Sequence, residues 1–177
     1  MKILLISPFF YPDEIGIALY NRLTVDYLLK KKHDVSVITS VPYYPEWKIK
    51  TPYDRVTLFK KENYLGATVF RVKQFVPRTP TVFKRVLQQM HFTILSFRYI
   101  YSVSKNSKII VVTPFTSSIV MALLVRFFRG GKIWCHVQDF EFDAAVETLQ
   151  LKLFKKSLFK IEAMLFDSCD SVSTISN

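Results

Sequence analysis

Short apolar runs rich in β-branched residues recur along the chain and predict strands. They occupy residues 3–7, 35–39, 68–72, 109–113, 133–137 and 171–175, each bounded by turn-forming residues. Most of these runs are apolar at nearly every position, whereas a strand with one solvated face alternates apolar and polar residues. The pattern therefore indicates strands buried on both faces, as in a parallel sheet covered by helices.

Four longer stretches between these runs have apolar residues at helical spacing. They predict helices over residues 17–32, 81–104, 116–129 and 148–168. The alternation of strand and helix predicts an α/β fold, a Rossmann-like, doubly wound, mainly parallel sheet with helices on both faces. In such a sheet the ligand crevice lies beyond the carboxyl ends of the strands, where strand order reverses, so the loops at residues 8–16, 114–118 and 136–143 should meet there.

The predicted helix over residues 81–104 carries two apolar rows. The first row has the spacing of a core-facing stripe, and we expect it to pack on the sheet. The second row is more apolar surface than one sheet face needs. The first consists of Phe83, Val86, Leu87, Met90, Ile94, Phe97 and Tyr101, and the second of Phe92, Leu95, Tyr99 and Val103.

Composition indicates a single globular domain with a basic balance. The chain has 177 residues, of which 50% are hydrophobic and 22% charged, which excludes a disordered tail. Cys135 and Cys169 have no metal-type spacing and are interpreted as reduced, buried residues of a cytosolic protein. The net charge of +11 suits an anionic partner: nucleic acid, an anionic membrane face or a phosphorylated ligand. We expect no signal peptide, and no apolar run approaches the ~20 residues that span a bilayer.

The loop between the first strand and the first helix, SPFFYPDEIGIALYN, is a candidate anion site. Its backbone N–H groups and the helix start should face the crevice, where the helix dipole favours phosphate. Gly16 would let a ligand approach the backbone closely; the alternative is that it only relieves a tight turn. The loop matches neither G-x-G-x-x-G nor a P-loop, so a dinucleotide oxidoreductase or an NTPase is poorly supported.

His136 ends the fifth predicted strand, beside the crevice, and is the candidate catalytic residue. An imidazole there can donate to a substrate hydroxyl or move a proton at neutral pH, although a lone histidine is more often structural. Asp139, Glu141 and Asp143 follow it, and we interpret them as a helix-capping and loop-solvating cluster, since no second group stands at metal spacing. A Ser-His-Asp hydrolase is poorly supported, because the sequence lacks the G-x-S-x-G motif of the nucleophile elbow.

The segment VPYYPEWKIKTPYD, residues 41–54, is predicted to be an ordered functional loop. It is rich in aromatic residues and proline and is too long for a tight turn. Its aromatic residues are candidates for stacking on the sugar or lipid of an acceptor. These candidates are Tyr43, Tyr44 and Trp47.

Three basic amphipathic stretches predict contact with an anionic bilayer. The candidate contacts are Lys84, Arg85 and Arg98 in the predicted helix over residues 81–104, and Lys155 and Lys156 in LKLFKKSLFK; RFFR at residues 126–129 is the third stretch. The alternative for any one stretch is a solvated helix face whose other side is core. Nucleic-acid binding rests on charge alone, because no helix-turn-helix, zinc or RNP-type pattern is present.

The motifs, in their order, resemble a known family. The stretches PFFYPDEIGIALYNRLTVDYLLKKKHDVSVITSVPYYPEW, ATVFRVKQFVPRT, IIVVTPF, IWCHVQDFEFDAAVETL and IEAMLFDSCDSVSTIS are similar to the N-terminal half of GT-B glycosyltransferases of family 4. The resemblance is to the branch that builds bacterial capsule, O-antigen or colanic-acid polysaccharides, including fucosyl and N-acetylfucosaminyl transferases.

This resemblance implies a retaining hexosyl transfer, without metal or cofactor, from a nucleotide sugar onto a lipid-linked acceptor at the cytoplasmic membrane face. In that fold the N-terminal domain mainly binds acceptor and the C-terminal domain mainly binds donor. Gly16, flanked by Glu14 and Ile15, matches the glycine-containing loop that approaches the donor phosphates. His136 matches the histidine near the reacting sugar and acceptor, and Asp139 matches the aspartate of the same motif.

The sequence ends at Asn177, and we expect it to lack the family's donor-binding domain. We therefore expect residues 1–177 to be one acceptor-side domain that does not turn over alone. Two alternatives remain open. One is a non-catalytic subunit that recruits a separate donor-binding chain to the membrane, and the other, less favoured, is a basic nucleic-acid-binding module.

Overall fold

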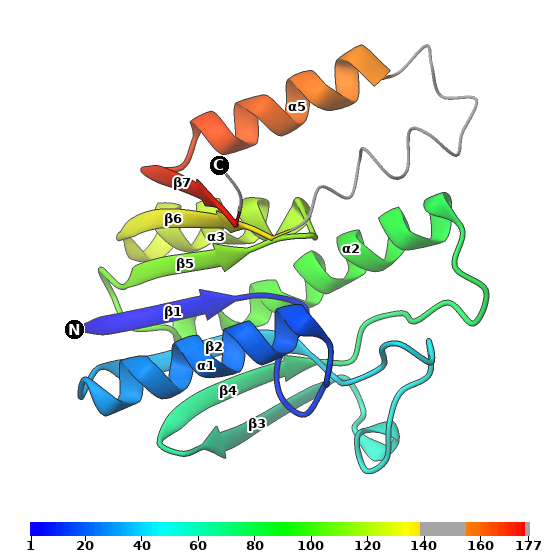
Figure 1. Cartoon of the computed structure of the whole chain (residues 1–177), viewed down its shortest axis with the longest axis horizontal. Helices are drawn as coiled ribbons and strands as arrows, with labels where there is room; N and C mark the ends of the chain where they lie inside the picture. The colour runs from blue at the N-terminus through cyan, green and yellow to red at the C-terminus, as the bar shows by residue number, and fades with distance from the viewer. Residues whose placement is uncertain (139–154, 176–177) are drawn as a thin grey trace.

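A computed structural model describes residues 1–138 and 155–175 of the chain. Seven strands within these residues form one sheet in the order β3-β4-β2-β1-β5-β6-β7 (Figure 1). The strands are β1 (Lys2–Ile6), β2 (Asp34–Ser40), β3 (Phe59–Tyr64), β4 (Ala67–Val72), β5 (Lys108–Val112), β6 (Lys132–Val137) and β7 (Ser171–Thr174). The helices are α1 (Gly16–Lys30), α2 (Val82–Ser96), α3 (Ser117–Arg129) and α5 (Lys155–Asp167), with 3-10 turns η1 (Tyr53–Arg55) and η2 (Phe97–Ser102).

The six predicted strands are confirmed, and each pairs in parallel with its neighbours among them. α1 covers one face of the sheet, whereas α2, α3 and α5 lie on the other (Figure 1). The predicted Rossmann-like α/β fold is therefore confirmed. The predicted helix over residues 148–168 is confirmed from Lys155 to Asp167, and its earlier part lies outside the described residues.

The strand β3 is an addition that the apolar pattern did not predict. It pairs antiparallel with β4, and the two-residue turn Leu65-Gly66 joins them. Both turn residues have positive φ, 49° and 103°, the conformation that suits a tight hairpin. The sequence of β3 is FKKENY, which is polar at most positions. This composition suits an edge strand, because one of its sides is solvated and its lysines disfavour pairing with the strands of other chains.

The core divides between the two faces of the sheet. Leu4 and Ile6 of β1 belong to the larger cluster, with α2 and α3, whereas Leu5 points to α1. Cys135 is buried in the larger cluster, where burial raises the pKa of its thiol to about 12. Cys169 is also a free cysteine and is only half-buried.

The two apolar rows on α2 and η2 are oriented opposite to the prediction. The row expected to pack on the sheet is exposed, with Phe83 at 77% and Ile94 at 64%, whereas Phe92 of the second row is fully buried. Tertiary hydrogen bonds fix this orientation of the helix about its axis. The apolar pattern of the sequence does not predict these bonds. The Thr93 hydroxyl donates to the Ser117 carbonyl of α3 at 3.2 Å, and the Tyr99 hydroxyl donates to the Arg71 carbonyl of β4 at 3.2 Å.

The predicted helix over residues 81–104 is also shorter than expected, because α2 ends at Ser96 and the chain continues as the 3-10 helix η2. Within the described parts of the chain, every helix is too short or too polar to cross a bilayer.

Candidate functional site

A pocket lies at the carboxyl edge of the sheet, beside β1 and β5, where the strand order reverses. Its lining comes from the β1–α1 loop and the start of α1, the loop after β2, the start of α2 and the loop after β5. These residues are Phe9, Ile15, Gly16, Ile17, Tyr44, Arg85 and Pro114. Two of the loops expected to meet at the crevice, residues 8–16 and 114–118, therefore do so.

The start of α1 leaves backbone donors at this pocket. Ile15 is the N-cap and has no side-chain acceptor to satisfy the first N–H groups of the helix. Gly16 lacks positive φ, and a Cβ placed on it would meet nothing within 4 Å. Neither a tight turn nor packing requires glycine at this position, which favours the reading that Gly16 leaves room for a ligand.

An aromatic cluster forms one wall of the site and joins the first loop to residues 41–54. Tyr43 is buried and stacks on Phe9, with ring centroids 5.7 Å apart. Trp47 contacts Tyr43 and Tyr44, at 5.8 Å and 5.9 Å. Tyr43 thus packs beneath the wall, whereas Tyr44 lines the pocket. Residues 41–54 therefore pack against the first loop, and the predicted function of this segment stays a prediction.

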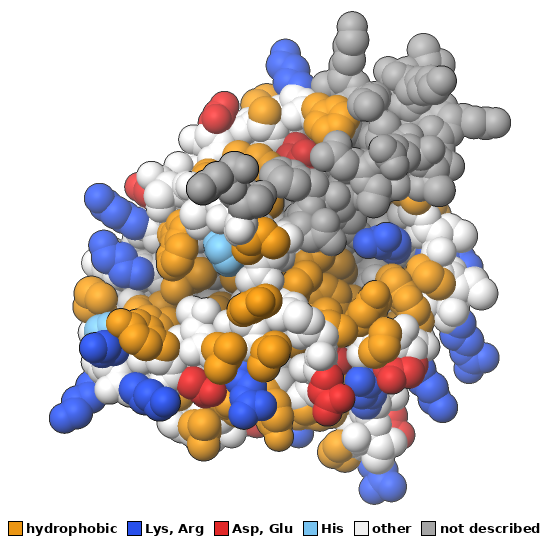
Figure 2. Space-filling view, viewed as in Figure 1, with side chains coloured by type: hydrophobic (Ala, Val, Ile, Leu, Met, Phe, Trp, Pro, Cys, Tyr) orange, Lys and Arg blue, Asp and Glu red, His pale blue; other side chains and the backbone are white. Residues whose placement is uncertain are grey.

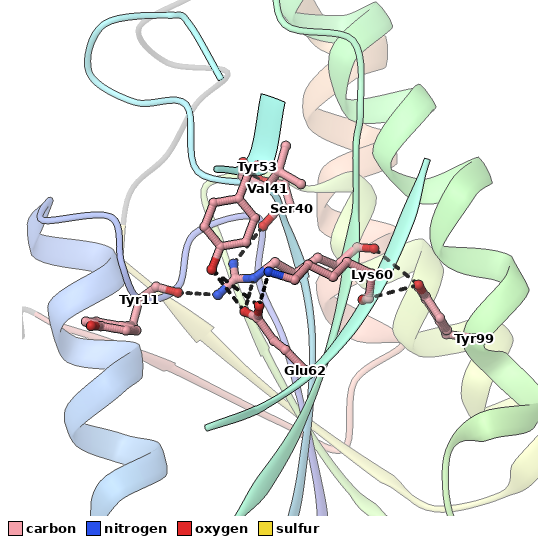
Figure 3. A network of polar contacts seen from close by, with 8 residues as sticks. Tyr11, Ser40, Val41, Tyr53, Lys60, Glu62 and Tyr99 are labelled. Carbon is pink, nitrogen blue, oxygen red and sulfur yellow. Dashed lines mark hydrogen bonds and ion pairs between the residues drawn. The ribbon is translucent and has the colours of Figure 1, made fainter. Parts of the chain in front are cut away.

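Arg71, near the end of β4, braces the loops around the pocket (Figure 3). The side chain is buried, and its guanidinium donates to the Ser40 carbonyl at 3.0 Å and to the Tyr11 carbonyl. It also pairs with Glu62 of β3, which accepts from the Tyr53 hydroxyl at 3.2 Å. One buried cation therefore joins the first loop, the end of β2 and the hairpin β3–β4.

Asp13 connects the first loop, residues 8–16, to the loop over residues 41–54. Its side chain is almost completely buried, and Lys50 lies 3.9 Å from one carboxylate oxygen. Burial raises the pKa of Asp13 to about 7, although the charges of Lys50 and Arg71 and a hydrogen bond from the Tyr43 N–H oppose this shift. The carboxyl group therefore titrates near neutral pH.

His136 lies at the end of β6 on the face of the sheet that carries α1. Its Nδ1 is 3.0 Å from the Ser173 hydroxyl, which also accepts from the Trp134 indole N–H at 2.9 Å. Because the indole can only donate, the serine proton is available to Nδ1, which favours the His136 tautomer with its proton on Nε2. Burial lowers the pKa of His136, so the neutral ring predominates at pH 7.

His136 stands apart from the residues that line the pocket. β6 lies two strands from β1, a lateral distance of roughly 10 Å. The Thr113 N–H, between them, donates to the His136 carbonyl at 3.2 Å. A substrate that reached both Gly16 and His136 would therefore lie along the carboxyl edge, across β5.

The other predicted site residues are distributed over the fold. Arg85 lines the pocket, although the sequence grouped it with Lys84 and Arg98 as a membrane contact. Glu14 is exposed beside the pocket loop. Lys155 and Lys156 begin α5, and Asp139 lies outside the described residues. Across residues 1–138 and 155–175, no group of three His, Cys, Asp or Glu side chains is arranged to hold a metal ion.

The fold and its carboxyl-edge pocket fit the class that the motifs predicted, the glycosyltransferases of bacterial surface polysaccharides. Over 146 residues the chain is 33% identical to the "Putative colanic acid biosynthesis glycosyl transferase WcaI" of Escherichia coli (strain K12). The similarity covers 81% of this chain but 35% of that relative, so the chain spans about a third of its length. The resemblance to colanic-acid type glycosyltransferases is thereby confirmed. No family model matches the chain.

Proposed function

We propose that this chain is the acceptor-binding half of a retaining, nucleotide-sugar-dependent hexosyltransferase of surface-polysaccharide synthesis. The observation that carries the proposal is the pocket at the reversal of strand order, where Gly16 and Arg85 stand opposite an aromatic wall. The similarity to a protein described as a colanic acid biosynthesis glycosyl transferase supports the reaction class.

The pocket combines two features that suit a phosphate-linked glycan. The guanidinium of Arg85 suits the phosphate or diphosphate of the acceptor. The rings of Tyr44 and Trp47 suit the apolar face of a sugar or the first lipid units. A lipid-linked glycan at the cytoplasmic face of the membrane carries all of these groups.

His136 is proposed to orient a hydroxyl of the reacting substrates. As a neutral ring with its proton on Nε2, it can donate one hydrogen bond, and Ser173 holds Nδ1 in place. The loop Glu14-Ile15-Gly16 is proposed to offer its backbone N–H groups to the phosphate of the donor as it leaves. Most of the nucleotide-sugar site would belong to a donor-binding domain.

Calorimetric titration tests the assignment of the chain to the acceptor side. The chain is titrated with a short-chain polyprenyl diphosphate glycan and, separately, with nucleotide sugars. We expect binding of the lipid-linked glycan, and we expect Arg85→Gln to weaken it by about tenfold or more through the loss of a charge-assisted hydrogen bond. Arg98→Gln is the matched control, because Arg98 is an exposed arginine stacked over Phe59, 5.0 Å from the ring centroid and outside the pocket.

Three results would contradict the proposal. Tight binding of a nucleotide sugar without affinity for the glycan would reverse the assignment of the two halves. Equal losses in Arg85→Gln and Arg98→Gln would remove the pocket as the binding site. Sugar transfer by residues 1–177 without any added chain would show that the donor site is complete here.

A further inference from the structure

The outer face of α2 and η2 has the character of a buried face. Its apolar residues follow one another at helical spacing, and we call them the outer stripe: Phe83, Leu87, Met90, Ile94, Phe97 and Tyr101, all exposed. The inner face, by contrast, buries three polar residues, Gln88, Gln89 and Ser96. A helix packed only against its own domain shows the reverse arrangement, so the outer stripe is unsuited to water.

Aromatic side chains of α3 extend this surface. Phe128 contacts Phe97 and Tyr101, with ring centroids 5.9 Å and 6.0 Å apart, and Phe127 contacts Phe128 at 5.0 Å. Phe127 is 82% exposed, more than any other large apolar residue in the described parts of the chain. The outer stripe and this aromatic pair therefore form one continuous apolar surface.

The stretch of chain that forms this surface carries charge of a single sign, and the segments packed against it add acidic side chains such as Asp170, 3.7 Å from Arg126 of α3. Residues 63–138, which contain α2, η2 and α3, hold eleven Lys and Arg residues and no Asp or Glu. The rest of the chain holds fourteen of each sign, so this stretch carries the entire net charge of +11. Around α1, in contrast, acidic and basic side chains are mixed (Figure 2).

We propose that the outer stripe, with Phe127 and Phe128, inserts into the interfacial region of an anionic lipid bilayer. Exposed apolar rings on a stretch of chain with a net positive charge are complementary to acyl chains below negatively charged headgroups. Arg98 is exposed and stacks over Phe59 at 5.0 Å, so its guanidinium can reach headgroups while its stem covers apolar surface. Arg129 lies 6.0 Å from the Tyr101 ring and donates to the Val103 carbonyl at 2.8 Å.

This inference deepens the proposed function and rests on it for its biological purpose. Phe83 and Lys84 directly precede Arg85, which lines the pocket. An outer stripe lying in the bilayer would hold the pocket beside the membrane surface, where a lipid-linked acceptor could reach it with its lipid still embedded.

Vesicle sedimentation tests the inference without glycan or nucleotide, so its result is independent of the proposed chemistry. The chain is mixed with phosphatidylcholine vesicles that contain or lack phosphatidylglycerol. We expect binding that requires the anionic lipid. We expect Ile94→Glu to lower the partition coefficient by about tenfold or more, because it removes an apolar side chain that the bilayer would bury. Leu23→Glu on α1 is the matched control: Leu23 is 52% and Ile94 64% exposed, and both variants change the charge equally.

The control should change partitioning by no more than about twofold, since headgroup charge is screened beyond roughly 10 Å. Circular dichroism checks that both variants fold, as expected for exposed positions. Absence of binding to anionic vesicles, or equal losses in the two variants, would overturn the inference. A dimer in sedimentation velocity that Ile94→Glu dissociates, without vesicle binding, would assign the surface to a second copy of the chain instead.

Discussion

Two glycines illustrate how the local environment separates a structural residue from a candidate functional one. Gly131 has φ 116°, and a Cβ there would lie 2.1 Å from the Ser107 carbonyl oxygen. Gly16 has neither constraint, although glycine is a poor residue for a helix start when no ligand needs the space. Only the backbone conformation and the space around each residue distinguish them.

We expect Gly16→Ala to fold as well as the natural chain and to bind the lipid-linked glycan more weakly. Alanine favours the helix by up to about 1 kcal/mol, whereas its methyl group enters the pocket. Gly131→Ala should instead lower the free energy of unfolding by about 1–3 kcal/mol. Urea unfolding and calorimetric titration measure the two effects, and unchanged glycan binding by Gly16→Ala would return Gly16 to a purely structural role.

The hydrogen bond between His136 and Ser173 sets which nitrogen of the His136 ring carries the proton. We expect the ring nitrogens to show a neutral imidazole at pH 7 with its proton on Nε2, because Ser173 holds Nδ1 as an acceptor. Ser173→Ala should increase the fraction protonated on Nδ1. Nitrogen chemical shifts of the imidazole measure both forms, and an unchanged ratio in Ser173→Ala would show that the serine does not orient the ring.

At the scale of elements, the carboxyl-edge loops depend on a buried arginine and its partly exposed carboxylate partner. Arg71 and Glu62 belong to the two strands of the β3–β4 hairpin, yet the guanidinium also binds carbonyl groups of the first loop and of β2 (Figure 3). A charge buried in this way is stabilising only while its partners remain in place. The hairpin that the apolar pattern missed therefore holds the pocket loops.

We expect Arg71→Met to lower the free energy of unfolding by about 2–4 kcal/mol, because the Ser40 and Tyr11 carbonyls lose their donor, each at a cost of roughly 1–3 kcal/mol. The double variant Arg71→Met, Glu62→Leu should recover little of this loss, because in the single variant Lys60, at 2.9 Å, and the Tyr53 hydroxyl still contact the Glu62 carboxylate. Urea unfolding measures all three proteins. A single variant as stable as the natural chain would show that Arg71 does not brace the loops.

At the scale of the whole molecule, Asp13 couples stability to pH. The pKa of its carboxyl group is raised by burial from 3.8 to about 7 in the folded chain. Between pH 4 and 7 the folded state keeps a proton that the unfolded state has lost. The contribution of this group is therefore full below pH 4, falls as the pH rises to 7 and stays constant above it.

We expect Asp13→Asn to remove this dependence. Relative to the variant, the natural chain should lose stability between pH 4 and 7, by no more than about 4 kcal/mol. Unfolding in urea at a series of pH values measures the difference. A difference that stays constant over this window would show that Asp13 ionises in the folded chain as it does in the unfolded one.

The sequence predicted more of the fold than of the site. Strands β1, β2, β4 and β5 were predictable because strands buried on both faces are apolar at nearly every position, whereas β3, with Lys60, Lys61 and Glu62, has the composition of a solvated segment. The predicted burial on both faces was wrong for β6, which alternates buried and exposed residues, and for β7, which is mostly exposed. The pocket loop was predictable because a loop at the end of the first strand must reach the carboxyl edge. Arg71 and Asp13 gave no signal, since their environment comes from residues distant in sequence.

The sequence by itself determined the alternation of strands and helices and thereby the places of Gly16 and His136 at the carboxyl edge, because strand and helix periodicities are local properties. Only the tertiary structure decided which side of α2 is buried, that Arg85 lines the pocket, and that Ser173 meets His136. Two apolar rows on one helix are equivalent in sequence. Their roles are set by hydrogen bonds such as Thr93 to Ser117 and Tyr99 to Arg71, which join segments more than twenty residues apart.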